Sequence, residues 1–426
     1  MMLVFWKCNK SATIRQSRLF GGCRAGWGLA LTLLLAACST IDDSQDGCPE
    51  AQVSSGNPDG AIAFSIDEGS TRAAKNTLTT DGSGANEASL QTLGFGVFAS
   101  YTGLHKYSES TVKPDFMYND RIHWDTDKWT YSPLRYWPNG EGEAPSGMAD
   151  NPHYVSFFAY APYSNGDSSD PATNPAGYCI PSFSYNHESG DPWLIYRIID
   201  QENLDKQVDL AYAMNLDEYR HVPNQAVSFS FNHALACFGD KVTIALDKKD
   251  DPDDSSEPDK AQEALERLEN VEVVLTNVSI DYALTNKAKL VLWNNGDPYW
   301  QPVLSEQMIA YRTVTFLDET SHPDGYTLFS RSGWTTDDSL NKNDDGKFCW
   351  ESTEDHAIFF IPLEVEGYPQ TATLSVTYDV VVDGVKDETM SKTKSTVLKL
   401  NQYYSDFKHG GWRLNVVNGT LTWEED

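Results

Sequence analysis

The sequence predicts an all-β fold arranged as two tandem β-sandwich domains. Short runs of alternating, β-branched or aromatic residues recur along the chain, separated by Gly, Pro, Asn and Asp. Few segments show helical periodicity, and no strand–helix–strand alternation favours a parallel sheet. The length of 426 residues suits two domains of ordinary size.

The expected strands are spaced as in sandwich proteins. In chain order they are Ala61–Ile66, Leu93–Tyr101, Phe116–Trp124, Trp129–Trp137, Tyr154–Tyr160, Tyr178–Tyr185, Val208–Met214, Val227–Phe231, Lys241–Leu246, Val271–Ile280, Lys289–Leu292, Tyr311–Phe316, Ala357–Pro362, Ala372–Val382, Ser395–Leu400 and Trp412–Trp423. A polar break at Tyr219–Asn224 divides them into two groups. We therefore expect an N-terminal domain at residues 59–221 and a C-terminal domain at residues 222–426.

One acidic stretch, Asp247–Asp259, interrupts the strand pattern. Its low apolar content predicts an exposed loop, and Ala261–Leu268 after it is rich in helix formers. Its carboxylates could hold calcium, but the stretch lacks the glycine and glutamate spacing of an EF-hand loop. A solvated loop followed by a short helix is therefore expected.

Residues 1–37 are typical of a lipoprotein signal peptide. Five Lys and Arg residues precede the apolar run Trp27–Ala37, which is shorter than the about 20 residues that a membrane-spanning helix needs. The run leads into Leu35-Ala36-Ala37-Cys38, which resembles the lipobox of bacterial lipoproteins. We expect lipid on Cys38 to anchor the chain in a membrane.

The acidic, turn-rich composition at the start of residues 38–58 predicts a flexible tether. The acidic residues just after Cys38 also resemble the surface-export signals of some Gram-negative lipoproteins. The cysteines beyond the lipobox are far apart and form no C-x-x-C pair, so the spacing of zinc ligands is absent. Export permits disulfides, but we expect free, mostly buried thiols at Cys48, Cys179, Cys237 and Cys349.

The charge balance is strongly acidic. The chain has 32 basic and 62 acidic residues, a net charge of −30, and loss of the signal peptide removes five cations and no acid. Such a surface repels nucleic acid and anionic lipid head groups. Nucleic-acid binding is therefore excluded as a function.

A succession of aromatic and small-residue motifs carries a family resemblance. In order they are Met117-Tyr118-Asn119, Trp129-Thr130-Tyr131-Ser132-Pro133, Tyr136-Trp137-Pro138, Ser156–Pro162 (SFFAYAP), Val208–Ala213 (VDLAYA) and Val227–Ala236 (VSFSFNHALA). From about Ala61 to Asp426 the chain resembles the fimbrillin-like family, the lipoproteins of major and minor fimbrillin type that build fimbriae in anaerobic Gram-negative bacteria. The resemblance implies that the chain is part of a fimbrium on the cell surface and that lipid on Cys38 anchors it in the outer membrane.

The resemblance also implies a fold and a mode of assembly. Family members have two transthyretin-like Greek-key β-sandwich domains. After export, an Arg-specific protease cuts the N-terminal domain and releases its first strand. A strand from another fimbrial subunit then fills the groove, held by main-chain hydrogen bonds and side-chain pockets.

Two features of this chain match that scheme. The segment with Ala61, Ile62, Phe64 and Ile66 alternates as a removable first strand should. Arg72, followed by Ala73, lies in a Gly-, Ser- and Asn-rich stretch and is the only Arg between Cys38 and Arg121. We expect cleavage between Arg72 and Ala73, although an ordinary surface Arg in a loop is the alternative. The C-terminal strands Val397–Leu400 and Arg413–Trp423 are the candidate donors.

The aromatic residues of the motifs have a structural explanation. Trp124, Trp129, Tyr131, Tyr136 and Trp137 are expected to pack across a sheet. The same residues could build a platform for carbohydrate, which is the less favoured interpretation. A non-polymerising surface lipoprotein, or a tip adhesin that binds a glycan or a host protein, is therefore the alternative function.

Catalysis is not expected. The acids are too numerous for any carboxylate pair to indicate a glycosidase, and the histidines are scattered. H-E-x-x-H, G-x-S-x-G and phosphate-loop motifs are absent. His233 follows an apolar strand and is expected to be packed and hydrogen-bonded. We predict no catalytic residue, no metal site and no cofactor.

Overall fold

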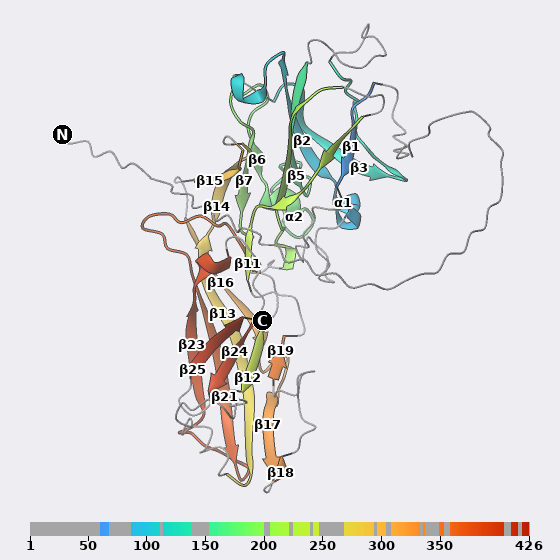
Figure 1. Ribbon diagram of the computed structural model, residues 1–426. Helices are drawn as coiled ribbons and strands as arrows, with labels where there is room; N and C mark the ends of the chain where they lie inside the picture. Colours follow the sequence, from blue (N-terminus) through green and yellow to red (C-terminus); the bar gives the residue numbers. More distant parts are fainter. Residues whose placement is uncertain are drawn as a thin grey trace, which may run out of the picture. The chain divides into compact units, whose positions relative to one another are not determined.

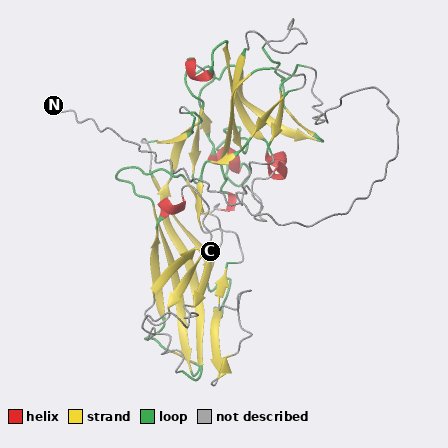
Figure 2. Cartoon of the chain, in the orientation of Figure 1, coloured by secondary structure: helices red, strands yellow, loops and turns green. Residues whose placement is uncertain are grey.

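The computed structural model confirms the all-β prediction. The elements are mainly strands in several sheets, and the described residues include two short α-helices (Figures 1 and 2). The structure describes residues 60–67, 87–110, 114–138, 153–199, 205–220, 225–238, 242–246, 268–293, 296–303, 308–332, 335–336, 349–352, 358–403, 410–415 and 420–425.

The elements up to residue 233 are β1 (Ala63–Ile66), α1 (Glu87–Leu93), β2 (Phe95–Gly103), β3 (Met117–Asp125), β4 (Lys128–Thr130), β5 (Tyr154–Ala161), α2 (Pro175–Cys179), β6 (Ser182–Phe183), β7 (Trp193–Arg197), β8 (Ala211–Glu218), β9 (Ala226–Phe229) and β10 (Asn232–His233). Those that follow are β11 (Ala236–Phe238), β12 (Thr243–Leu246), β13 (Val271–Thr285), β14 (Lys287–Val291), β15 (Tyr299–Pro302), β16 (Ile309–Leu317), β17 (Tyr326–Ser332), β18 (Thr335–Thr336), β19 (Cys349–Glu351), β20 (Ile358–Phe360), β21 (Thr371–Val382), β22 (Val385–Lys386), β23 (Lys392–Leu398), β24 (Gly410–Asn415) and β25 (Thr420–Glu425).

A six-stranded antiparallel sheet organises the first part of the chain, in the order β10-β8-β5-β2-β3-β4. Its central strands β2 and β5 are buried on both faces. Because side chains alternate along a strand, Phe95 and Phe157 join one hydrophobic core, and Phe98 and Phe158 join another. The sheet therefore lies between two cores.

A second, longer sheet is built on β13 and β21, which pair with each other along most of their length. The other edge of β13 pairs with β16 and β17, and the other edge of β21 pairs with β22 and β23. Buried and half-buried residues alternate along β21, so one face of this sheet is covered.

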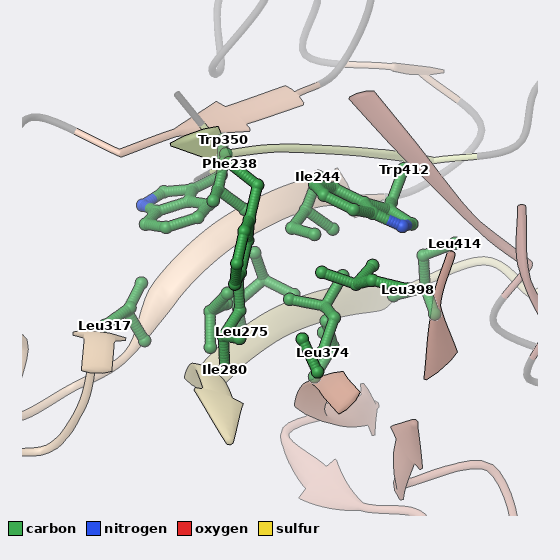
Figure 3. Close-up of a cluster of buried hydrophobic side chains, with 14 of the residues drawn as sticks. Phe238, Ile244, Leu275, Ile280, Leu317, Trp350, Leu374, Leu398, Trp412 and Leu414 are labelled. Atoms are coloured by element: carbon green, nitrogen blue, oxygen red, sulfur yellow. The ribbon is translucent and has the colours of Figure 1, made fainter. Parts of the chain in front are cut away.

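The covered face packs against a four-stranded sheet of order β19-β12-β24-β25. Leu275 and Leu374 of the longer sheet share one core with Ile244, Trp350 and Trp412 of the shorter sheet. Figure 3 shows these side chains in that core. The opposite face of the longer sheet carries Ser, Thr and Asp side chains that are half-buried or exposed.

Strand pairing joins residues from both sides of Val222. β9 pairs in parallel with β1, and β14 pairs antiparallel with β7 in the sheet of order β15-β14-β7-β6. Among the described strands, the other parallel pair is β12 with β24. A parallel sheet was not expected from the sequence, and these short parallel pairs form between strands that are far apart in the chain.

Two of the expected strands differ from the observed elements. Part of Tyr178–Tyr185 belongs to α2, because Asn174 Oδ1 accepts the Gly177 N–H at 3.2 Å and Pro175 opens the first turn. In Trp129–Trp137 the strand β4 ends at residue 130.

Candidate functional site

β1 follows Ala61 and Ile62, and together they form a short segment, Ala61–Ile66, which we call the first-strand segment. The register of its pairing with β9 runs from Ala63 opposite Ala226 to Ile66 opposite Phe229. The described strands give β9 no second strand partner. The first-strand segment thus supplies the sheet pairing of β9.

The start of the segment is also held on a second side. The Ile62 N–H donates to the Arg135 carbonyl at 2.9 Å, and the Trp137 N–H donates to the Gly60 carbonyl at 3.2 Å. The Tyr131 hydroxyl donates to the Ile62 carbonyl at 3.1 Å. These bonds leave Ser65 and Ile66 at the end of the segment paired through β9 alone.

The first-strand segment is deeply buried. Ala61, Ile62, Phe64 and Ile66 are 4%, 0%, 5% and 9% exposed, so the four residues expected to occupy a groove lie in the core. Ala63 is buried as well. Strict alternation of buried and polar residues was expected, whereas both sides of the segment are covered and only Ser65 is half-buried.

Phe64 lies at the centre of an aromatic cluster. Its ring centroid lies 6.4 Å from that of Phe95, 5.4 Å from Tyr131, 5.9 Å from Phe157 and 5.7 Å from Phe229. Phe95 belongs to β2, Phe157 to β5 and Phe229 to β9, and Tyr131 directly follows β4. Departure of the first-strand segment would therefore uncover an apolar groove bordered by the unpaired backbone of β9.

The motif aromatics are placed largely as expected. Trp124 and Trp129 face each other across β3 and β4 with ring centroids 5.3 Å apart. Trp129, Tyr131 and Trp137 are buried in the same core as Phe64. Tyr136 differs, because it is 53% exposed opposite Ala61. These residues form the wall of the groove, and no carbohydrate platform is needed to explain them.

Burial perturbs two polar groups beside this segment. The pKa of the Tyr131 hydroxyl is raised to about 12, chiefly by burial, so it remains a hydrogen-bond donor at neutral pH. Burial also raises the pKa of Asp120, and the Arg135 guanidinium, 3.9 Å away, lowers it in part. Asp120 Oδ2 has no hydrogen-bond partner in the part of the chain that the structure describes.

Asp120→Asn is expected to stabilise the chain at neutral pH. A carboxyl with a raised folded pKa binds its proton more readily in the folded state, so its ionised form costs stability above that pKa. The cost disappears as the pH falls through the raised value. Urea unfolding should show a gain in the free energy of unfolding of about 1 kcal/mol at neutral pH that shrinks as the pH is lowered.

Asp115→Asn is the matched control for this prediction. Asp115 is an exposed acid just before β3, so its replacement should leave the free energy of unfolding almost unchanged at both pH values. An Asp120→Asn variant that is less stable than wild type at neutral pH would contradict the prediction.

Other residues named from the sequence lie outside the described residues. Cys38, Arg72 and Ala73 are among them, as are the tether at residues 38–58, the acidic stretch Asp247–Asp259 and Cys48. Within the described ranges, Cys179, Cys237 and Cys349 are buried free thiols, as expected. Burial raises the pKa of the Cys179 thiol to about 12, which keeps it unreactive.

His233 is packed, as expected, and its partner was not anticipated. Its Nδ1 lies 2.7 Å from Asp209 Oδ2, and the Asp209 side chain is 1% exposed. β10 pairs with β8 so that His233 lies opposite Ala211. The two motifs that contain Asp209 and His233 therefore meet in the structure.

The part of the chain that the structure describes contains no group of three or more His, Cys, Asp or Glu that could hold a metal ion. None of the described helices is long and apolar enough to cross a bilayer.

Comparisons with known proteins agree with this architecture. No family model matches the chain. The fimbrium subunit Fim1C of Phocaeicola vulgatus is 22% identical over 378 residues, which cover 85% of this chain and 87% of that protein. A crystal structure of a fimbrial protein from Bacteroides vulgatus matches with a TM-score of 0.55 and 20% identity, over 86% of this chain and 98% of that one.

The resemblance to the fimbrillin-like family is confirmed. The solved fimbrial protein shares the fold of this chain over 86% of its length.

Proposed function

We propose that this chain is a structural subunit of cell-surface fimbriae, polymerising by strand exchange after its first strand is removed. It is exported as a lipoprotein and held at the outer membrane by lipid on Cys38. An Arg-specific protease cuts between Arg72 and Ala73, and a strand of another fimbrial subunit replaces the first-strand segment. Its body consists of two tandem transthyretin-like sandwiches at residues 59–221 and 222–426, with β9, β10 and β14 of the second range pairing with strands of the first.

The observation that carries this proposal is the position of the first-strand segment. It buries five apolar side chains, and residues 68–86 separate it in the sequence from the next described element, α1. Arg72 lies in that interval. One cut there would separate the segment covalently from the rest of the fold, while the groove residues on β2, β5 and β9 stay with the mature chain.

The vacated groove is suited to another strand. β9 would regain its main-chain partner, and the ring cluster would again be covered by apolar side chains. The neighbouring subunit therefore needs a strand with large apolar residues at alternate positions. The similarity to a fimbrium subunit supports such a role for this chain.

Of the two candidate donors, the region Arg413–Trp423 is favoured. β25 (Thr420–Glu425) overlaps the end of this region, pairs only with β24 among the described strands, and is the edge strand of its sheet. Val397–Leu400 lies at the end of β23, which pairs with β21 along its whole length. Release of β25 would break fewer contacts, so we assign the donor to β25.

Treatment of the purified full-length chain with an Arg-specific protease tests the proposal. We expect a new N-terminus at Ala73 and a ladder of oligomers that resists mild detergent. Arg72→Ala should stay uncut and monomeric. Lys75→Ala is the matched control, since it removes a neighbouring cation that such a protease does not recognise, and it should behave as wild type.

A second variant separates processing from assembly. A chain that ends at Asn418 lacks β25, so it should be cut at Arg72 but should not form the ladder. Cleavage at Ala73 without oligomers in the wild-type chain, or oligomers formed by Arg72→Ala, would overturn strand exchange.

A further inference from the structure

An open depression of about 680 Å³ lies on the exposed face of the longer sheet. It forms where β16, β13 and β21 run side by side (Figure 1). Two cross-strand rows of three residues lie on that face: Tyr311, Ala283 and Thr371 in one row, and Thr313, Asp281 and Thr373 in the next. Because side chains alternate along strands, these six residues share one face.

Tyr311 supplies an aromatic surface to the depression. It is 71% exposed, and its ring makes no ring contact within the described parts of the chain. Its neighbour in the row is Ala283, a small residue that lines the depression and packs with Met308 and Ile309 on its other side. A flat apolar ring beside a shallow floor is suited to a ligand with its own flat apolar face.

Polar groups line the second row. Asp281 Oδ1 accepts a hydrogen bond from the Thr313 hydroxyl at 2.6 Å, which fixes the carboxylate beside the ring. The Thr371 and Thr373 hydroxyls bond to no described residue. Farther along the same face the hydroxyls pair with each other, Ser375 with Ser395 at 2.9 Å and Thr377 with Thr393 at 2.9 Å. The unpaired hydroxyls thus gather where the depression lies.

We propose that this depression binds a neutral saccharide. A pyranose ring can lay its C–H face on Tyr311 while its hydroxyls donate to Asp281 and exchange hydrogen bonds with Thr371 and Thr373. The carboxylate and the net charge of −30 disfavour sialylated or sulfated sugars. The volume lies within the roughly 300–1,000 Å³ of small-molecule sites.

The site is independent of the proposed assembly. It uses β13, β16 and β21, whereas strand exchange uses the groove around Phe64 and the edge strand β25. Because the depression is open, much of a bound disaccharide stays in water, and we expect a Kd of about 1 mM for one site.

Saturation-transfer NMR on the uncut full-length chain tests this site separately from polymerisation. The probes are the neutral disaccharides maltose, cellobiose, lactose and diacetylchitobiose, with sialyllactose as the charged comparison. We expect transfer to at least one neutral disaccharide and weaker transfer to sialyllactose. Tyr311→Ala should weaken binding by about tenfold or more, and the isosteric Thr373→Val by about threefold.

Tyr185→Ala is the matched control, because Tyr185 is 74% exposed and lies in the loop after β6, away from β13, β16 and β21 in the chain. It should bind as wild type does, and thermal unfolding should confirm that all variants fold. Absence of transfer from all four neutral disaccharides, equal binding by Tyr311→Ala and wild type, or a preference for sialyllactose over lactose would each overturn the inference.

Discussion

Phe64→Ala is expected to lower the free energy of unfolding of the uncut chain by about 3–5 kcal/mol. The side chain is 5% exposed and contacts four aromatic rings contributed by separate parts of the first core. Because these rings come from several strands, the cavity cannot close by moving a single strand. Chemical denaturation at equilibrium measures the loss.

Val385→Ala is the control, since Val385 is 69% exposed in a short edge strand and should change stability by less than about 0.5 kcal/mol. The proposed cleavage at Arg72 leads to a second expectation, for the assembled polymer. Once Arg72 has been cut and the strand replaced, residue 64 no longer belongs to the subunit, so assembled Phe64→Ala and wild-type polymers should be equally stable. A polymer weakened by Phe64→Ala would contradict the loss of that strand.

His233→Ala is expected to lower the free energy of unfolding by about 3–5 kcal/mol. The substitution leaves the Asp209 carboxylate, 1% exposed, without the imidazole that lies 2.7 Å away. Removing one partner of a buried polar pair leaves the other buried beside a cavity, which costs more than replacing both partners. The double variant Asp209→Ala/His233→Ala should therefore be more stable than His233→Ala, and denaturant unfolding of the three variants gives the coupling energy.

Lys386→Ala provides the matched control for an ion pair. Lys386 Nζ lies 2.8 Å from Asp379 Oδ1, but the two side chains are 45% and 25% exposed. Water screens such a pair, and its loss should change the free energy of unfolding far less than His233→Ala does. Equal losses for His233→Ala and Lys386→Ala would show that burial does not set the cost at His233.

The fold class could be predicted from the sequence because a strand with one buried face alternates apolar and polar residues. Thr371–Val382 alternates buried and half-buried residues, and it was expected as a strand almost to its bounds. Less regular strands such as β7 and β17 were missed. The apolar run of β7 is only Trp193–Tyr196. So short a run does not distinguish a buried strand from a buried helical segment.

The candidate site was predicted in part. The segment from Ala61 to Ile66 was identified by its own alternation, and its burial agrees with a role in the core. The parallel pairing with β9 could not be foreseen, since no local turn links strands so far apart. The Asp209–His233 contact likewise depends on the register between β8 and β10, which neither motif encodes alone.

Parallel pairing of β1 with β9 has a consequence for folding kinetics. Ala63 pairs with Ala226, so the 162 residues between the two partners must emerge before the pair can form. At ribosomal rates this takes about 10–30 s, and such non-local pairs close late. Once β9 is present, the covalent connection gives the chain's own strand an effective concentration of roughly millimolar near its binding position. Competing strands from other molecules are thereby kept out while the connection lasts.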